Sequence, residues 1–145
     1  MTVDAVHVVC SHCDAVNRIA YVRLNDKPKC GKCHRLLFAG QAIELTDGNF
    51  LKHLTRNDLP VVVDFWAPWC GPCKIMGPAF NEACHSVEPH IRMAKLNTEA
   101  YQMIAARYQV RSIPTMILFK QGQERARQAG AMNVADIVRW VKAHS

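Results

Sequence analysis

Three C-x-x-C pairs constrain the structure of this chain more than any other feature of its sequence. Six of its seven cysteines form them: Cys10/Cys13, Cys30/Cys33 and Cys70/Cys73. The first two pairs lie within the first 40 residues, which hold too few large apolar side chains for a core of their own. A segment of that size usually depends on a metal or on disulfides for its stability. We therefore expect two parts, one held together by cysteines and one folded around a hydrophobic core.

The first four cysteines have the spacing C-x2-C-x16-C-x2-C, which is typical of a tetrahedral zinc site. Each pair can form a tight turn that supplies two thiolates, and Gly31 gives the second turn conformational freedom. We expect one structural Zn²⁺ per chain, held by Cys10, Cys13, Cys30 and Cys33. Two further redox disulfides are the alternative, which a reducing compartment and the lack of a helix behind either pair disfavour. Because four thiolates complete the shell, His12 and His34 are expected on the surface.

The composition is that of a globular protein, with 50% apolar and 21% charged residues. No apolar run approaches the roughly 18 residues that span a bilayer, because Pro60 and Asp64 interrupt the richest one. The N-terminus lacks the basic and apolar segments of a secretory signal, so we expect a cytoplasmic protein with no membrane partner. The net charge of +6 would fall to about +4 with zinc on four thiolates. This excess favours loose attraction to acidic partners, and no nucleic acid is expected because the basic residues, Tyr21 apart, are not interleaved with aromatic ones.

From about residue 44 onward, strand and helix patterns alternate. Four strands are expected, at residues 61–66, 91–96, 114–119 and 123–129. Three helices are expected, one from just after Cys73 to Val87, a short one at 99–108, and a last one capped by Asn133. Pro78 lies inside the first of them, where it should bend the axis.

The order of these elements predicts the fold class. A strand, a helix and a strand in succession form a right-handed unit with parallel strands, whereas the closing hairpin is antiparallel. We therefore expect an α/β fold, a mixed central sheet flanked by helices, at residues 43–145. It follows a zinc-binding N-terminal module at residues 1–42, with the joint near Gly40 to Ala42.

Cys70 and Cys73 follow a buried strand at the point where a helix begins. Two cysteines three apart in a first helical turn lie on one face with Cα atoms about 5–6 Å apart, a separation that a disulfide spans. Free amides and the positive end of the helix dipole stabilise a thiolate at Cys70 and lower its pKa, which predicts that Cys70 is the nucleophile. Cys73, one turn further on, suits the resolving role.

Asp64 interrupts the same strand two residues before Trp66. Burial would raise the pKa of its carboxyl group, and we interpret Asp64 as a base near Cys73. The alternative is that its side chain reaches the sheet surface or a helix N-terminus. Lys95, in the next parallel strand, would sit beside Asp64 and tune it, although a lysine in a strand is more often surface charge. Cys84, on the apolar helix face, is expected to be a small buried hydrophobe.

The second segment resembles thioredoxin over about residues 44–145. The resemblance rests on Asp64-Phe-Trp-Ala-Pro-Trp-Cys-Gly-Pro-Cys-Lys74, Pro78, Lys95-Leu96-Asn97, Arg111-Ser-Ile-Pro-Thr115 and Gly130-Ala131. It implies the thioredoxin fold and a cis peptide bond between Ile113 and Pro114, opposite the active disulfide. It also implies a shallow apolar groove for substrate backbone, formed by Trp69, Gly71, Pro72, Ile113, Pro114, Gly130 and Ala131. Ser112 stands where glycine is common in the family.

The resemblance further implies a protein-disulfide reductase that acts by thiol–disulfide exchange through Cys70 and Cys73. No G-x-G-x-x-G motif is present, so we expect no organic cofactor. The implied partners are disulfide-containing client proteins and a flavin- and NADPH-dependent thioredoxin reductase. Two features disfavour an oxidase or isomerase: the residues Gly71-Pro72 between the two cysteines, and the missing export signal. A zinc-dependent, redox-regulated client-binding module or holdase is the alternative from another functional class.

The whole chain resembles the zinc-containing bacterial thioredoxins called thioredoxin-2, because of its first four cysteines and Asn17-Arg18. The role of the module stays open between shaping substrate choice, stabilising the fold and sensing oxidation. One hypothesis is that an oxidant converts the four thiolates to disulfides and releases the zinc.

Overall fold

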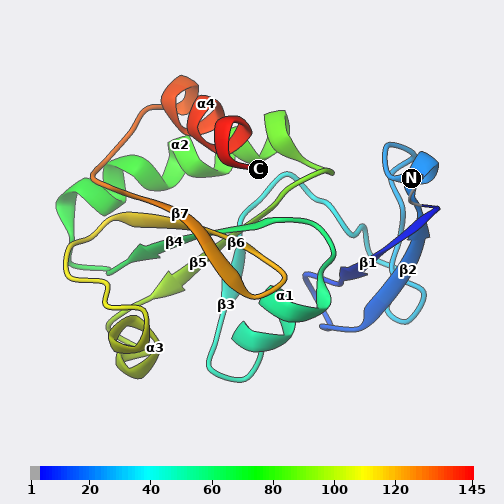
Figure 1. The fold of residues 1–145 in the computed structure, drawn as a ribbon, viewed down its shortest axis with the longest axis horizontal. Helices are drawn as coiled ribbons and strands as arrows, with labels where there is room; N and C mark the ends of the chain where they lie inside the picture. Colours follow the sequence, from blue (N-terminus) through cyan, green and yellow to red (C-terminus); the bar gives the residue numbers. More distant parts are fainter. Residues whose placement is uncertain (1–3) are drawn as a thin grey trace.

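The computed structural model describes residues 4–145 as an N-terminal hairpin module beside a larger layered domain (Figure 1). In the module, β1 (Ala5–Val9) and β2 (Val16–Ala20) pair antiparallel, and a short 3-10 helix η1 (Tyr21–Arg23) follows. The domain contains, in order, β3 (Ile43–Leu45), α1 (Phe50–Arg56), β4 (Val61–Trp66), α2 (Gly71–Val87), β5 (Arg92–Asn97), α3 (Gln102–Arg107), β6 (Thr115–Lys120), β7 (Gln123–Ala129) and α4 (Val134–His144).

The domain is built on a five-stranded sheet with the strand order β3-β5-β4-β6-β7. β3 and β4 run parallel to β5, whereas β6 is antiparallel to both β4 and β7. Helices α2 and α4 cover one face and α1 and α3 the other (Figure 1). The expected mixed sheet flanked by helices is thereby confirmed.

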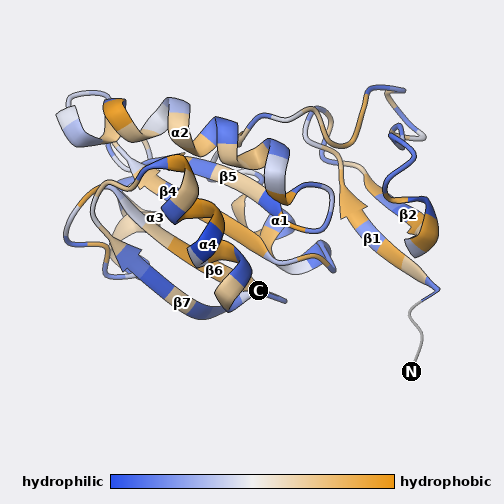
Figure 2. Ribbon diagram, turned by 90° about the horizontal axis from the view of Figure 1, so that it is seen from above, coloured by the Kyte–Doolittle hydropathy of each residue, from blue (hydrophilic) through white to orange (hydrophobic). Residues whose placement is uncertain are grey.

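The alternation of side chains along β4 explains how the sheet is buried on both faces. Val62 packs against α2 and α4, whereas Val63 and Phe65 pack against α1 and α3. A strand that is buried on both faces has a nearly continuous run of apolar residues, which is why β4 could be recognised in the sequence. The same alternation places Asp64 on the α2 face. The edge strand β7 is polar and exposed, as its blue colour in Figure 2 shows, and a charged edge discourages unwanted pairing.

The expected strands and helices are present, with small shifts at their ends. α3 begins at Gln102 and not near 99, because the side chain of Asn97 accepts hydrogen bonds from the amides of Glu99 and Ala100. Asn133 caps α4 as expected and accepts from the amide of Asp136 at 2.8 Å. α2 continues through Pro78 without a break. The elements α1, β1, β2 and β3 had not been anticipated, and none of the helices described is long and apolar enough to cross a membrane.

The module has a small core, so the expectation that its residues could not form one was wrong in part. Val6, Val8, Leu24 and Leu37 are buried together with two of the cysteines. Leu59, which immediately precedes β4, completes this cluster from the domain side. The domain therefore contributes an apolar side chain to the core of the module, so the module needs fewer apolar residues of its own.

Candidate active site and metal centre

Cys70 and Cys73 lie where β4 ends and α2 begins, and they form a disulfide with a Cα–Cα distance of 5.2 Å. Cys70 is the N-cap of α2, and its sulfur accepts a hydrogen bond from the amide of Cys73 at 3.3 Å. Both are almost fully buried, at 5% and 3% exposure. Pro72 is accommodated because the first amides of a helix have no partner within it. The predicted placement of the pair at a helix N-terminus is confirmed.

The loop before β6 closes over the disulfide. The carbonyl oxygen of Ile113 lies 3.8 Å from the sulfur of Cys70, and the Ile113–Pro114 peptide bond is cis, as the resemblance implies. Gly130, whose φ of +98° suits glycine, donates its amide to the carbonyl of Pro114 at 2.9 Å. The end of β7 therefore lies beside this loop. Trp69, next to Cys70, is 67% exposed and presents an apolar surface at the same end of the sheet.

Asp64 is buried on the α2 face, at 3% exposure, and Lys95 is its direct neighbour in the parallel strand β5. Burial raises the pKa of Asp64 to about 7, against the opposing charge of Lys95. One carboxylate oxygen, Oδ1, has no hydrogen-bond partner among the residues described, and the side chain opens on a cleft of about 350 Å³. The cleft also includes Gly77 and Pro78, one turn beyond Cys73. Asp64 and Lys95 are therefore neighbours in the sheet, as predicted. The alternative of a surface carboxylate for Asp64 is wrong, because the side chain is buried.

Lys95 is only partly exposed, and two groups hold its ammonium group near the cleft. Its Nζ lies 3.3 Å from a carboxylate oxygen of Glu44, in the neighbouring strand β3. It also lies over the ring of Trp66, 5.4 Å from the centroid. From this position the charge of Lys95 opposes the rise in the pKa of Asp64.

The four sulfurs of the expected metal site all lie within 4.8 Å of one another: Cys10, Cys13, Cys30 and Cys33. The Sγ atoms of Cys10 and Cys33, and those of Cys13 and Cys30, are each 3.6 Å apart. Tetrahedral zinc with bonds of about 2.3 Å places its sulfur ligands about 3.8 Å apart. The arrangement therefore fits one zinc-sized cation, and His12 and His34 are exposed beside it as expected.

Amide donors surround the sulfur of Cys30 and favour its anionic form, whereas burial raises the pKa of the Cys10 thiol. Amide donation from Cys33, with further donation from Asn17 and Lys32, lowers the pKa of Cys30 to about 5 against the opposing effect of burial. Asn17 also accepts from the amide of Gly31 at 2.8 Å, so it holds the second cysteine turn in place. Thiolates stabilised in this way are ligands suited to a soft divalent cation.

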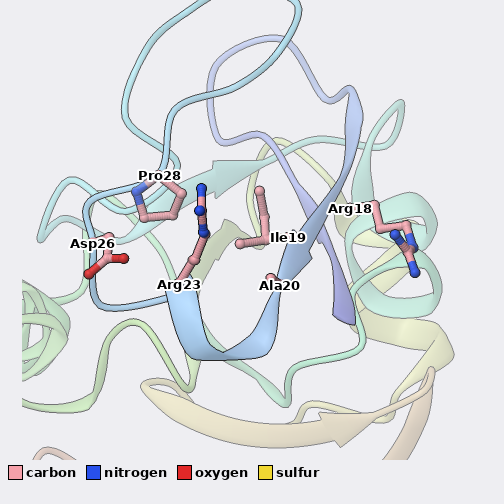
Figure 3. A pocket seen from close by; sticks show the side chains of 6 residues that line it. All are labelled: Arg18, Ile19, Ala20, Arg23, Asp26 and Pro28. Carbon is pink, nitrogen blue, oxygen red and sulfur yellow. The ribbon is translucent and has the colours of Figure 1, made fainter. Parts of the chain in front are cut away.

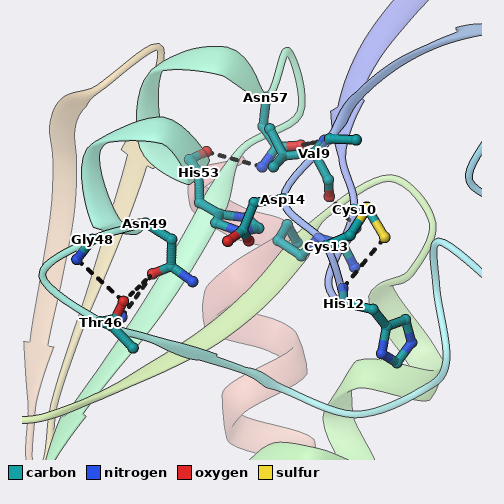
Figure 4. Close-up of polar contacts among 12 residues, drawn as sticks. Val9, Cys10, His12, Cys13, Asp14, Thr46, Gly48, Asn49, His53 and Asn57 are labelled. Carbon is teal, nitrogen blue, oxygen red and sulfur yellow. Dashed lines mark hydrogen bonds and ion pairs between the residues drawn. The ribbon is translucent and has the colours of Figure 1, made fainter. Parts of the chain in front are cut away.

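Three side chains of the domain hold the first cysteine turn, and sequence reasoning missed all of them; Figure 4 shows two, His53 and Asn57. Asp14, the residue after Cys13, bonds to the buried ring of His53 at 2.8 Å. The amide of Val9 donates to Asn57 at 2.8 Å. Burial lowers the pKa of His53, so its ring is largely neutral at pH 7 and acts as a hydrogen-bonding group.

Arg92, at the start of β5, is the third of these side chains and is 1% exposed. Its Nη2 donates to the carbonyl of Val9 at 3.1 Å, and its Nη1 lies 3.8 Å from Glu88. Its guanidinium also covers the ring of Phe38, 4.5 Å from the centroid. The only available signal in the sequence was a charged residue near the start of a predicted strand. Cys84 is fully buried in α2, as expected.

A family described as Thioredoxin matches residues 41–143, and one described as Thioredoxin 2, N-terminal, matches residues 9–35. The chain is 40% identical over 134 residues to Thioredoxin C-3 of Corynebacterium nephridii, covering 92% of each chain. It is 38% identical over 103 residues to Thioredoxin 1 of a Nostoc species, covering 71% of this chain and 96% of that one. It is 35% identical over 104 residues to the thioredoxin of Haemophilus influenzae, covering 72% and 97%. The chain therefore belongs to the thioredoxin family of oxidoreductases that act on protein disulfides.

Proposed function

We propose that this protein reduces disulfides of client proteins by dithiol–disulfide exchange at Cys70 and Cys73. The observation that carries the proposal is the position of Cys70 at the start of α2, where the amide of Cys73 donates to its sulfur at 3.3 Å. In the reduced protein this amide and the helix dipole stabilise a thiolate at Cys70. Cys73 lies within the first turn of α2, beyond the N-cap position, so we expect it to act second.

The proposed reaction moves two electrons from the protein to the client. The Cys70 thiolate attacks one sulfur of the client disulfide, which forms a mixed disulfide and releases the other client sulfur as a thiolate. Cys73 then loses its proton, and its thiolate attacks the sulfur of Cys70. This second exchange forms the Cys70–Cys73 disulfide and releases the remaining client thiolate.

We propose that Asp64 is the base that accepts the proton of Cys73. Burial brings the pKa of this carboxyl group to about 7, so it can accept a proton at neutral pH. Its cleft opens beside α2 one turn beyond Cys73, on the side of the sheet that this helix covers. Lys95 stabilises the ionised form of Asp64 and so adjusts when the base is available.

The client backbone would lie in an apolar groove beside Cys70. We assign to it the seven residues Trp69, Gly71, Pro72, Ile113, Pro114, Gly130 and Ala131. The exposed indole of Trp69 and the approach of the Ile113 carbonyl to Cys70 support this assignment. The oxidised pair must regain two electrons, for which we propose a thioredoxin reductase that uses flavin and NADPH.

The reductase proposal is tested by trapping the first intermediate. A Cys73→Ser variant can form the mixed disulfide but cannot resolve it. Incubated with oxidised insulin, it should accumulate a covalent adduct through Cys70, detected by mass spectrometry and released by dithiothreitol. Absence of any adduct, with the Cys70 thiol shown to be free, would contradict the proposed order of attack.

We propose that the module, residues 1–42, holds one Zn²⁺ through Cys10, Cys13, Cys30 and Cys33, beside the catalytic domain at residues 43–145. The metal would join the two cysteine turns and so stabilise a segment that has only a small core of its own. Asp14, Asn57 and Arg92 would in turn tie the first turn to the domain, because each bonds across the boundary.

An Arg92→Met variant is expected to lose about 3 kcal/mol of unfolding free energy, because it leaves Glu88 buried without its partner and the Val9 carbonyl without its donor. It should also release zinc to a chelating dye faster than the wild type does. Denaturant unfolding and zinc content by mass spectrometry measure the two effects. The double variant Arg92→Met/Glu88→Gln is the matched control and should recover part of the loss. Wild-type stability and wild-type zinc release in the single variant would contradict the assigned role of Arg92.

A further inference from the structure

The two outer edges of the module hairpin differ in their hydrogen bonding. On the β1 edge, both backbone groups of His7 bond to Asp58. The amide of Asp58 donates to the His7 carbonyl at 2.9 Å, and the His7 amide donates to the side-chain carboxylate of Asp58. Val9 donates to Asn57 and accepts from Arg92. The β1 edge is therefore closed by the domain.

The outer edge of β2 has no such cover. The amide of Cys10 donates to the carbonyl of Ala15, and the amide of Tyr21 donates to the carbonyl of Asp4. In an antiparallel pair, every second pair of facing residues is joined by backbone hydrogen bonds. The amides of Val16, Arg18 and Ala20 and the carbonyls of Val16 and Arg18 consequently point away from β1. Within residues 4–145 no protein group bonds to them. An open strand edge is a template for pairing with another extended chain.

A hollow of about 460 Å³ lies beside this edge, within the range of about 300–1,000 Å³ found for ligand pockets (Figure 3). Ile19, Ala20 and Pro28 supply its apolar walls. Figure 3 shows Arg23 extending between Pro28 and Ile19, and Arg18 leaving the strand on the other side. A chain paired with β2 would place side chains in this hollow.

Basic residues predominate in the sequence around β2, and two of the side chains that line the hollow, Arg18 and Arg23, are basic. Residues 15–36 contain six basic side chains and a single acidic one, Asp26, whereas the whole chain has a net charge of +6. The segment that contains β2 is thus more basic than the chain as a whole. Two copies of this edge would repel each other, and the only aromatic side chain between residues 15 and 36 is Tyr21, which leaves little surface for stacking nucleotide bases.

We propose that the open edge of β2 binds an extended, acidic segment of a partner protein, which adds a third strand to the module. Strand addition of this kind takes its affinity from main-chain hydrogen bonds and its specificity from pockets beside the edge. The binding goes beyond thiol–disulfide exchange. The module packs at the end of the sheet where β4 starts, whereas Cys70 follows the other end of β4 (Figure 1).

The geometry of Ala20 permits a direct test. Its φ is −59° and its ψ 130°, so proline fits this position without strain and removes only the outward amide. The probe is a fluorescent ten-residue peptide that alternates valine and glutamate and contains no cysteine. Binding to the oxidised, zinc-loaded full chain is measured by fluorescence anisotropy. The Ala20→Pro variant should bind it at least about tenfold more weakly, whereas Ala20→Ser, which keeps the amide, should bind it like the wild type.

Charge is tested separately. The variant Arg18→Glu/Arg23→Glu should bind the glutamate peptide at least about tenfold more weakly and should prefer a peptide with lysine in place of glutamate. Wild-type binding should weaken as salt is raised. A glutamate peptide in which every backbone amide is methylated has no donor on either edge, so it cannot pair with a strand and should not bind. Because the methylated peptide is tested on the wild-type chain, this comparison remains valid even if the proline variant folds poorly.

Several outcomes would overturn the proposal: no binding of the glutamate peptide, equal binding of the methylated peptide, self-association of the chain through this edge, or displacement of the peptide by single-stranded DNA at equal concentration. A Cys70→Ser variant should bind the peptide unchanged. That result keeps a failure of this proposal separate from a failure of the reductase function.

Discussion

A Cys70→Ser variant is expected to lose insulin reduction by about a thousandfold or more, to the level of the chemical reductant alone. The hydroxyl of serine does not ionise near neutral pH, and it cannot form a mixed disulfide with the client. The loss removes the first step of the exchange, so no amount of substrate restores the rate. Turbidity of insulin in the presence of dithiothreitol measures the effect.

The matched control for this variant is Cys84→Ala, on the same helix α2. Cys84 is fully buried, and burial raises the pKa of its thiol to about 12, so it is a poor nucleophile at neutral pH. The Cys84→Ala variant should reduce insulin at the wild-type rate. If Cys70→Ser kept a substantial rate, or if Cys84→Ala lost it, Cys70 would not be the nucleophile.

An Asp64→Asn variant is expected to be more stable than the wild type at pH 8, by up to about 4 kcal/mol. The pKa of Asp64 is raised from 3.8 to about 7 in the folded protein, chiefly by burial. The folded state therefore binds the proton more tightly than the unfolded state does. This contribution to stability is fully present below about pH 4, is lost as the pH rises through about 7, and does not change further above it.

Asparagine has no such titration, so the difference between the two proteins should be small near pH 4 and should reach its full size above pH 7. Urea unfolding of the oxidised proteins across this range measures it. Asp47→Asn, at an exposed loop position, is the control and should follow the wild type at every pH. A difference that stays constant with pH would contradict the assignment of a raised pKa to Asp64. The Asp64→Asn variant should also slow resolution of the mixed disulfide more than its formation.

The proposed catalytic end of the protein could be predicted from its sequence because its determinants are local. Cys70 and Cys73 lie one helical turn apart, and the helix start is marked by the end of an apolar strand. That the strands of Asp64 and Lys95 lie side by side was also predictable, because the two parallel strands of such a unit are usually neighbours in the sheet. The four metal-site cysteines were identified by spacing alone.

The joint between the module and the domain could not be predicted in the same way. Asp14 and His53 are 39 positions apart, Val9 and Asn57 are 48 apart, and Val9 and Arg92 are 83 apart. No periodicity or spacing rule links such residues, because the contacts exist only once two separate units have packed together. The module core was missed for the same reason, since Leu59 enters it from the domain.

The pH dependence of alkylation at Cys70 tests the central claim most directly. In the reduced protein, with zinc bound and Cys73 replaced by serine, the rate of reaction with iodoacetamide should follow a single pKa well below the value of about 8.5 for free cysteine, near the value of about 7 known for thioredoxins. That result would show that the helix start stabilises the thiolate. A pKa at or above about 8.5 would contradict the account.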